Sequence, residues 1–327
     1  DWALRGRSEP LAEIFQIKGN SECGYGLGAS DEECNFELVA PLCEEQVNGC
    51  SGPTSFAREG LKIGMALQQK LGFNPIQVGF IGSTDNHNSL PGDTEEYDYR
   101  GSSVLHESPA RARLGQEGGS AIKGKFPGAV VRGKNPGGLA AVWARENSRD
   151  EIFEAMQRRE TYATSGTRIQ LRFFAGRAFA DDIFSDPEFL KSAYAGGVPM
   201  GSVLPEGEGV PEFLVWAQQD STAAPLQKVQ MVKAWMQGGE ARESVVDIAC
   251  SDGLSPDPGT GRCPDNGARV DISTCAVSAD KGASELKVRW KDSDFDAKQA
   301  AVYYVRVLEN PSCRWSTYDS IRIGEAP

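Results

Sequence analysis

Short apolar runs and one longer amphipathic stretch alternate through the first quarter of the chain. Residues 10–17 predict a buried strand, residues 54–72 predict a helix, and residues 74–82 predict a second buried strand. Strand, helix and strand in this order are typical of a parallel α/β unit. The loop between the first strand and the helix, residues 19–53, is long, and we expect its cysteines to staple it.

The pattern continues with a third apolar run and a second helix. Residues 138–144 predict a strand. Residues 148–160 predict a helix in which Ser148 and Glu151 form a capping box. Residues 92–138 lie before these elements and are rich in Gly, Ser and Arg, so we expect them to form a long surface excursion.

The second half of the chain has a different pattern. Residues 167–176 alternate between apolar and polar positions, and five further β-like runs follow, separated by clusters of turn residues. Short strands at this spacing predict an antiparallel β-sandwich. The sequence therefore predicts an α/β plus all-β fold, with an α/β domain over residues 1–166 and a β-sandwich domain over residues 167–327.

Composition narrows the classes of function. The chain has 34 Lys and Arg against 46 Asp and Glu, which gives a net charge of −12. This excess of acid argues against a nucleic-acid partner, because binding a phosphate backbone needs a basic surface. All apolar runs fall far short of the ~18 residues of a membrane helix, so we expect no membrane span. The opening residues, DWALRGRSEP, lack an initiator Met and indicate a processed or trimmed product.

The cysteines predict a compartment. Their even number and their loop setting favour disulfides over zinc, which prefers short Cys-x₂₋₄-Cys pairs. Disulfides would imply an oxidising location, either the periplasm or the cell exterior. Each cluster of four allows three connectivities, and we expect sequential pairing. The expected bonds are Cys23–Cys34, Cys43–Cys50, Cys250–Cys263 and Cys275–Cys313.

The second buried strand ends in a candidate metal motif, Asp85-x-His87. In an extended segment, residues two apart point to the same face, so a carboxylate and an imidazole could bind the same ion. Ligands of parallel α/β folds gather at the carboxyl ends of the strands, where this motif lies. The alternative is a polar turn, with Asp85 accepting backbone N–H bonds and His87 exposed.

The supply of ligands limits the metal hypothesis. The chain has two histidines, His87 and His106, and a catalytic zinc takes three protein ligands. The ion would therefore be held by oxygen ligands, or the centre would be incomplete in this chain. We expect His106 to lie on the surface rather than to line the site.

Two residues after the first strand are weaker candidates for a catalytic part. Lys18 could hold an anionic substrate, and Glu22 could act as an acid, a base or a ligand. The alternative is a strand that leads into a solvated loop. Two other motifs fail: residues 291–298 lack the Gly and Glu of a complete EF-hand, and residues 133–138 lack the ending of a phosphate loop.

Several motifs together resemble a known family. EPLAEIFQIKGNSEC, VGFIGSTDNHN, RRETYATSGTRI, GGVPMG and AVYYVRVLENPSCRWSTYD look like the bacterial family catalogued as domain of unknown function 3604. The likeness runs from about residue 9 to residue 320. Members of that family resemble the polymerase-and-histidinol-phosphatase (PHP) superfamily of metal-dependent phosphoesterases, which folds as a distorted β/α barrel.

The resemblance implies a metal-binding function and an incomplete site. GSTDNH matches the last metal motif of the superfamily, so Asp85 and His87 would be ligands of divalent ions, with Zn, Mn and Fe as the candidates. The earlier His-x-His motif and the middle His and Glu motifs are absent here. The chain would then be the C-terminal part of a longer protein: the last units of a PHP-like barrel, followed by the β-sandwich.

Two functions follow as hypotheses. In the first, the intact protein is a periplasmic or secreted metal-dependent hydrolase of a small, anionic substrate, and this chain alone is inactive and binds divalent ions weakly. In the second, the sandwich is a non-catalytic module that binds a glycan or a protein. Its candidate contact residues are Trp216, Trp235, Trp290 and Trp315, unless these aromatic side chains fill the sandwich core.

Overall fold

The computed structural model describes the chain except for residues 30, 39, 44–49, 103–108 and 117–133. His106 therefore lies outside the described residues. The described α-helices are α1 (Trp2–Ser8), α2 (Ala57–Leu71), α3 (Ala110–Arg113), α4 (Arg149–Gln157), α5 (Phe189–Gly196) and α6 (Trp315–Arg322). None of them is long and apolar enough to cross a membrane.

The strands belong to a mixed α/β protein with several antiparallel sheets. The first part contains β1 (Leu11–Gln16), β2 (Gly19–Asn20), β3 (Gly79–Gly82), β4 (Leu139–Val142) and β5 (Thr161–Thr164). The second part contains β6 (Gln170–Gly176), β7 (Gly197–Pro199), β8 (Glu212–Gln218), β9 (Leu226–Gln237), β10 (Glu240–Cys250), β11 (Val270–Asp271), β12 (Ala276–Val277), β13 (Glu285–Lys291) and β14 (Ala301–Glu309).

The predicted strand–helix–strand unit is present. β1 and β3 pair in parallel, with Leu11 opposite Gly79, and α2 connects them. The helix ends where Gly72 adopts a left-handed conformation at φ 77°, a position that favours glycine. The second strand is shorter than predicted, because residues 74–78 form no strand. In the described residues these strands form open sheets, and there is no closed barrel.

The third predicted strand pairs differently from a parallel α/β unit. β4 pairs antiparallel with β5, and the side-chain hydroxyl of Thr161 on β5 donates to the Phe80 carbonyl of β3 at 3.0 Å. The helix α4 has the expected Ser148 cap, whose hydroxyl accepts the Glu151 N–H. Its apolar residues are less buried than its pattern suggests, since Phe153 is 59% exposed.

Two antiparallel sheets form the sandwich in the second part of the chain. One sheet has the order β13-β8-β6-β7, and the other has the order β10-β9-β14. Apolar side chains from both inner faces form one core, because alternate residues of a strand point to the same face. Its buried members are Leu171, Phe173, Phe213, Val215, Ala217, Leu226, Val229, Met231, Ile248 and Leu286.

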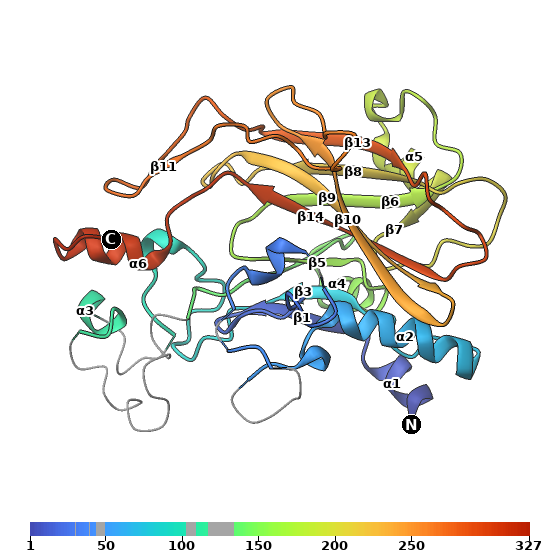
Figure 1. Cartoon of the computed structure of the whole chain (residues 1–327), viewed down its shortest axis with the longest axis horizontal. Helices are drawn as coiled ribbons and strands as arrows, with labels where there is room; N and C mark the ends of the chain where they lie inside the picture. The colour runs from blue at the N-terminus through green and yellow to red at the C-terminus, as the bar shows by residue number, and fades with distance from the viewer. Residues whose placement is uncertain (30, 39, 44–49, 103–108, 117–133) are drawn as a thin grey trace.

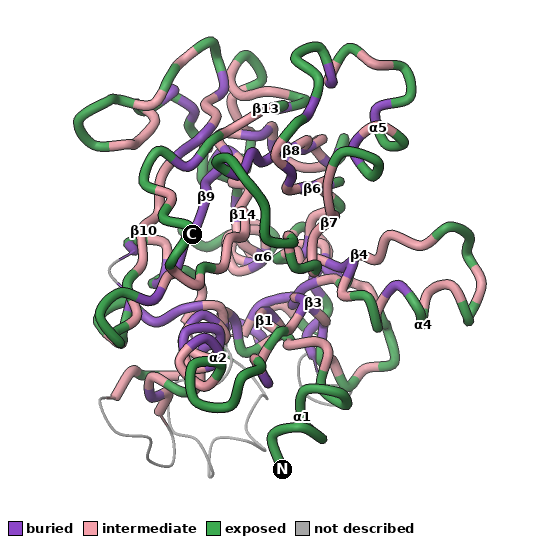
Figure 2. Tube along the Cα trace, turned by 90° about the vertical axis from the view of Figure 1, so that its right-hand side faces the viewer, coloured by how far each residue is buried: buried purple, intermediate pink, exposed green. Residues whose placement is uncertain are grey.

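The α/β part packs against the outer face of the β10-β9-β14 sheet (Figure 1). Met65 of α2 contacts Ala234 and Met236 of β9, which point away from the sandwich core. The inner side of α2 is accordingly buried, as the tube in Figure 2 shows. One face of β9 thus serves the sandwich core, and the other joins the two parts of the molecule.

After β14 the chain leaves the sandwich and ends in α6, which lies beside α3 (Figure 1). This helix was not predicted from the sequence. Four disulfides join the eight cysteines in consecutive pairs along the chain. This is the sequential pairing that the sequence predicted. The disulfides are Cys23–Cys34, Cys43–Cys50, Cys250–Cys263 and Cys275–Cys313.

Candidate metal centre

The backbone beyond β1 and β3 brings the carboxyl ends of the two strands together. The Ser83 N–H donates to the Phe15 carbonyl at 2.9 Å, and the Ile17 N–H donates to the Thr84 carbonyl at 3.3 Å. These bonds continue the parallel pairing past the strand ends and place Asp85 at this edge. The edge is the one where parallel α/β folds bind ligands.

Residues 134–138 form the next layer of this edge. The Asn135 N–H donates to the Ile17 carbonyl, and the Gly138 N–H donates to the Ser83 carbonyl at 2.7 Å. Gly137 has φ 87°, and a Cβ added there would lie 2.6 Å from the Thr84 Cα. The Gly-rich segment that fails as a phosphate loop therefore supports the end of β3, at a distance that only glycine allows.

Asp85 and His87 lie close together and open to solvent. The Asp85 Oδ1 and His87 Nε2 atoms are 3.7 Å apart, and the side chains are 45% and 75% exposed, respectively. Asp85 has φ 47°, a left-handed conformation that few non-glycine residues adopt, although Asp is among those that tolerate it. A carboxylate oxygen and an imidazole nitrogen suit a divalent ion such as Zn²⁺, Mn²⁺ or Fe²⁺.

The described residues provide no third ligand for this pair. The one trio of potential ligand side chains close enough to hold an ion, within the described part of the chain, is Cys23, Asp31 and Cys34. The two sulfur atoms of that trio are bonded to each other, so it is not a metal site. Asp85 and His87 therefore form a pair of potential ligands, and the described residues bring no third potential ligand close to them.

Lys18 lies at the same edge of the sheet, directly after Ile17. The residue is exposed, and its ammonium group donates to the Ser21 hydroxyl at 2.5 Å. On the β3 side, the Ser83 hydroxyl donates to the Glu13 carboxylate, which also accepts from the Gln16 amide at 2.7 Å. The edge therefore combines a cation with the two candidate ligands.

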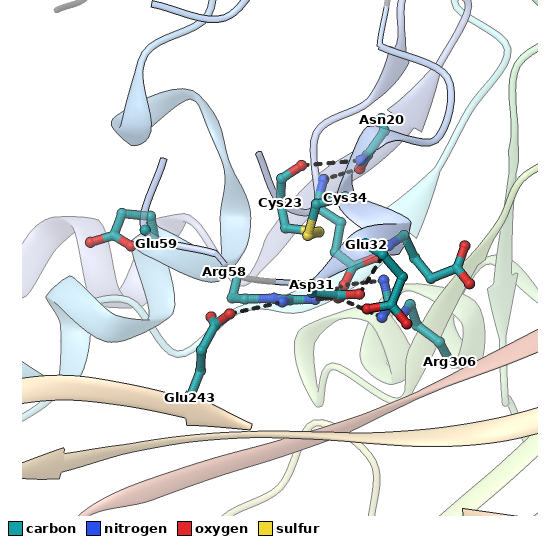
Figure 3. The surroundings of a disulfide bond; sticks show 12 residues. Asn20, Cys23, Asp31, Glu32, Cys34, Arg58, Glu59, Glu243 and Arg306 are labelled. Atoms are coloured by element: carbon teal, nitrogen blue, oxygen red, sulfur yellow. Dashed lines mark hydrogen bonds and ion pairs between the residues drawn. A yellow bond between two sulfur atoms is a disulfide. The ribbon is translucent and has the colours of Figure 1, made fainter. Parts of the chain in front are cut away.

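Glu22 lies in a different setting, a buried ion cluster between the 19–53 loop, α2 and β14. Its Oε1 accepts from Arg58 Nη2 at 2.6 Å and from the Tyr304 hydroxyl at 2.7 Å. Arg58 also donates to Asp31 at 2.9 Å, and Arg306 donates to the same carboxylate at 2.5 Å. Figure 3 shows Arg58, Asp31 and Arg306 of this cluster beside the Cys23–Cys34 disulfide.

The pKa values of this cluster are shifted by burial and by the neighbouring charges. Burial alone raises the pKa of Asp31, but the guanidinium groups of Arg306 and Arg58 together lower it below its usual value. Burial and the nearby Glu22 raise the pKa of Tyr304 well above its usual range. Asp31 therefore keeps its negative charge and Tyr304 keeps its proton at neutral pH. The catalytic part suggested for Glu22 stays a prediction, and the cluster gives this carboxylate a structural role.

Two carboxylates near the site have no signal in the sequence pattern. Burial raises the pKa of Glu96 to about 7, although the Trp315 backbone N–H and Arg314 favour its charged form. Burial likewise raises the pKa of Glu37, whose carboxylate pairs with Arg314 at 2.8 Å. Their partners come from the far end of the chain, so periodicity and spacing could not have identified them.

The whole chain, residues 1–327, matches the family described as protein of unknown function (DUF3604). The chain belongs to the DUF3604 family. No curated protein and no solved structure matches it.

The tryptophans of the second hypothesis mostly take part in packing. Trp290 packs against Phe213 in the sandwich core, and Trp216 packs edge-on against Phe189. Trp315 is 1% exposed and lies outside that core, against Tyr99. Trp235 lies beneath the Lys233 ammonium, 4.9 Å from it. Contacts within the molecule thus explain why tryptophan occurs at these four positions.

Proposed function

We propose that this DUF3604 chain supplies two ligands, Asp85 and His87, to the divalent-metal centre of a hydrolase. The observation that carries the proposal is the approach of Asp85 Oδ1 to His87 Nε2, at 3.7 Å, where β1 and β3 end side by side. Both side chains are exposed to solvent. An isolated polar turn would not require this pairing of a carboxylate with an imidazole.

A divalent ion, when bound, lowers the pKa of a water molecule and so supplies a nucleophile for ester hydrolysis at neutral pH. In this proposal the residues of this chain hold the ion and orient the substrate. Asp85 would hold the ion through a carboxylate oxygen and His87 through an imidazole nitrogen. The Lys18 ammonium at the same edge offers a positive charge to an anionic substrate. The substrate class that we favour is a phosphate ester.

The rest of the centre belongs to the intact protein, which we define as this chain together with a preceding portion. That portion would complete a PHP-like barrel and provide the remaining ligands. The openness of Asp85 and His87 supports this arrangement, because ligands of a finished site are usually enclosed. The four disulfides support a periplasmic or secreted location.

Metal-dependent phosphoesterase activity of the intact protein tests the proposal. With Mn²⁺ and an aryl phosphate, Asp85→Ala and His87→Ala should each lower the rate at least about 100-fold, because each removes a ligand. Asp98→Ala is the matched control: this exposed carboxylate pairs with Arg100 and should leave the rate unchanged. Equal rates in wild type, Asp85→Ala and His87→Ala would refute the role of both residues.

The binding-module hypothesis gains no support from the sandwich. A glycan platform needs an exposed aromatic face, and the four tryptophans are used in packing or lie beneath a lysine. Glycan binding by residues 167–327 would revive it. The fragment begins at 167 because β6, which pairs with β8, must be included.

A further inference from the structure

The C-terminal helix α6 is hydrogen-bonded to two positions between β3 and β4, Lys134 and Glu96. The Trp315 indole N–H donates to the Lys134 carbonyl at 2.8 Å, and Arg314 donates to the same carbonyl at 3.3 Å. The Trp315 backbone N–H donates to Glu96 at 2.6 Å. Trp315 itself is 1% exposed, so its contacts exclude water.

A buried ion pair fixes the same helix at a second point. Arg113 on α3 donates to both carboxylate oxygens of Asp319, at 2.7 and 2.9 Å. The two side chains are 7% and 1% exposed. The disulfide between Cys275 and Cys313 anchors the start of the helix to the sandwich side. The helix is thus held on one side by the disulfide to Cys275 and on the other by Glu96, Arg113 and Lys134.

From Lys134 the contacts lead directly to His87. The Lys134 ammonium donates to the Ser102 hydroxyl at 2.9 Å, and the His87 backbone N–H donates to the Ser102 carbonyl at 2.7 Å. The Asn88 amide adds a second bond, to the Gly101 carbonyl at 2.6 Å. These contacts connect α6 to residues 85–88, which we call the His87 loop.

We propose that Trp315 is a positioning residue, which fixes the His87 loop through Lys134 and Ser102. Asp85 is exposed and left-handed, and the backbone bond from His87 to Ser102 is one of the contacts that order this loop. Ser102 is bonded in turn to Lys134, whose carbonyl accepts from Trp315. A ligand must be held within a fraction of an ångström to bind an ion well. The effect on metal binding rests on the proposed function, whereas the mechanical coupling to His87 does not.

Hydrogen exchange at the His87 amide tests the coupling in the chain itself. Trp315→Phe keeps a ring against Tyr99 but removes the indole N–H that Lys134 accepts. We expect the His87 amide to exchange about fivefold faster, as the loss of one hydrogen bond predicts. Amides of β9 should keep their wild-type rates.

Trp143→Phe is the matched control. The Trp143 indole also donates to a backbone carbonyl, that of Leu171, at the same 2.8 Å. Trp143 directly follows β4, whose last residue pairs with Thr161. Thr161 lies beside Gly79 at the start of β3, and the candidate ligands follow the other end of that strand. Arg314→Gln, at a side chain that is 38% exposed, is a milder second variant that should shift His87 in the same direction. Wild-type exchange at His87 in Trp315→Phe, or equal acceleration in Trp143→Phe, would overturn the coupling.

Mn²⁺ affinity of the intact protein tests the consequence for the site. Trp315→Phe should weaken Mn²⁺ binding several-fold, and Trp143→Phe should not. Faster exchange at His87 with unchanged Mn²⁺ affinity would overturn the positioning role. If Asp85→Ala also leaves Mn²⁺ binding unchanged, the proposed function fails, and the exchange rates alone then decide the coupling.

Discussion

At the scale of single residues, the edge that carries Asp85 and His87 depends on very close backbone contacts. Gly137 approaches Thr84 so closely that no side chain fits between them, and Gly138 lies similarly close to the Thr164 carbonyl. These glycines let residues 134–138 lie flat against the end of β3. The shape of the candidate site is therefore set one residue before its first ligand.

Gly137→Ala should destabilise the protein by more than about 2 kcal/mol, because it adds both a left-handed alanine and a backbone clash. Gly238→Ala is the matched control. Gly238 also has a positive φ, 62°, but a Cβ there would meet nothing within 4 Å. It should cost only about 1 kcal/mol. Equal losses in chemical denaturation would show that the contact with Thr84 is unimportant.

The residues of the site differ in how far the sequence could reveal them. Asp85 and His87 stand out because two polar ligand types follow a buried strand at a spacing of two. Arg58 and Glu22 are 36 residues apart, and Tyr304 comes from the other end of the chain. No local pattern encodes such a cluster, since Tyr304 and Arg306 of β14 meet Glu22 and Asp31 only in the folded molecule.

At the scale of elements, the most predictable parts are those with a strong period. β1, α2, β9 and β14 follow from apolar runs or from alternation. The helix α6 has eight residues, too few for a clear period, and an isolated helix of that length is unstable in water. Its stability comes from Asp319 and Trp315, whose partners are about 200 residues away.

The junction of α2 with β10 and β14 yields a prediction at this scale. Arg58 is 1% exposed and lies against Glu22, Asp31 and Glu243. Arg58→Ala should lower the free energy of unfolding by about 3–5 kcal/mol, because it leaves buried carboxylates without their partner. Arg145→Ala removes an equally short pair with Glu151, but that arginine is 77% exposed. Urea denaturation should show little change for this control, and a similar loss in both would contradict the account.

At the scale of the whole molecule, the sandwich is part of the framework of the candidate site. The β10-β9-β14 sheet of the sandwich supports α2 on its outer face (Figure 1). The last strand of the sandwich, β14, leads into α6, which bonds to Lys134. The sequence predicted two domains over residues 1–166 and 167–327, and that division stays a prediction. The contacts between the two parts include the buried ion cluster, and such contacts favour joint unfolding.

The docking of α6 should make the stability of the molecule depend on pH. Burial raises the pKa of Glu96 from its ordinary 4.5 to about 7, and Arg314, Glu37, Tyr318 and the Trp315 N–H face it. Between these pH values the folded protein keeps a proton that the unfolded chain has released. The free energy of unfolding should therefore fall as pH rises through this window.

Glu96→Gln keeps a neutral acceptor for Trp315 and should remove this loss. We expect the variant to match wild type at pH 5 and to exceed it by about 2 kcal/mol at pH 8, measured by denaturation at both values. Glu206→Gln, at an exposed position, is the control and should keep the wild-type profile. A Glu96→Gln variant with the wild-type slope would show that Glu96 ionises without cost.

The central claim is that Asp85 and His87 are metal ligands, and elemental analysis of the intact protein tests it most directly. Wild type should retain divalent metal through gel filtration, and Asp85→Ala and His87→Ala should each lose at least one ion per molecule. His106→Ala, at the other histidine of this chain, should keep the wild-type content. Unchanged metal content in both Asp85→Ala and His87→Ala would contradict the account.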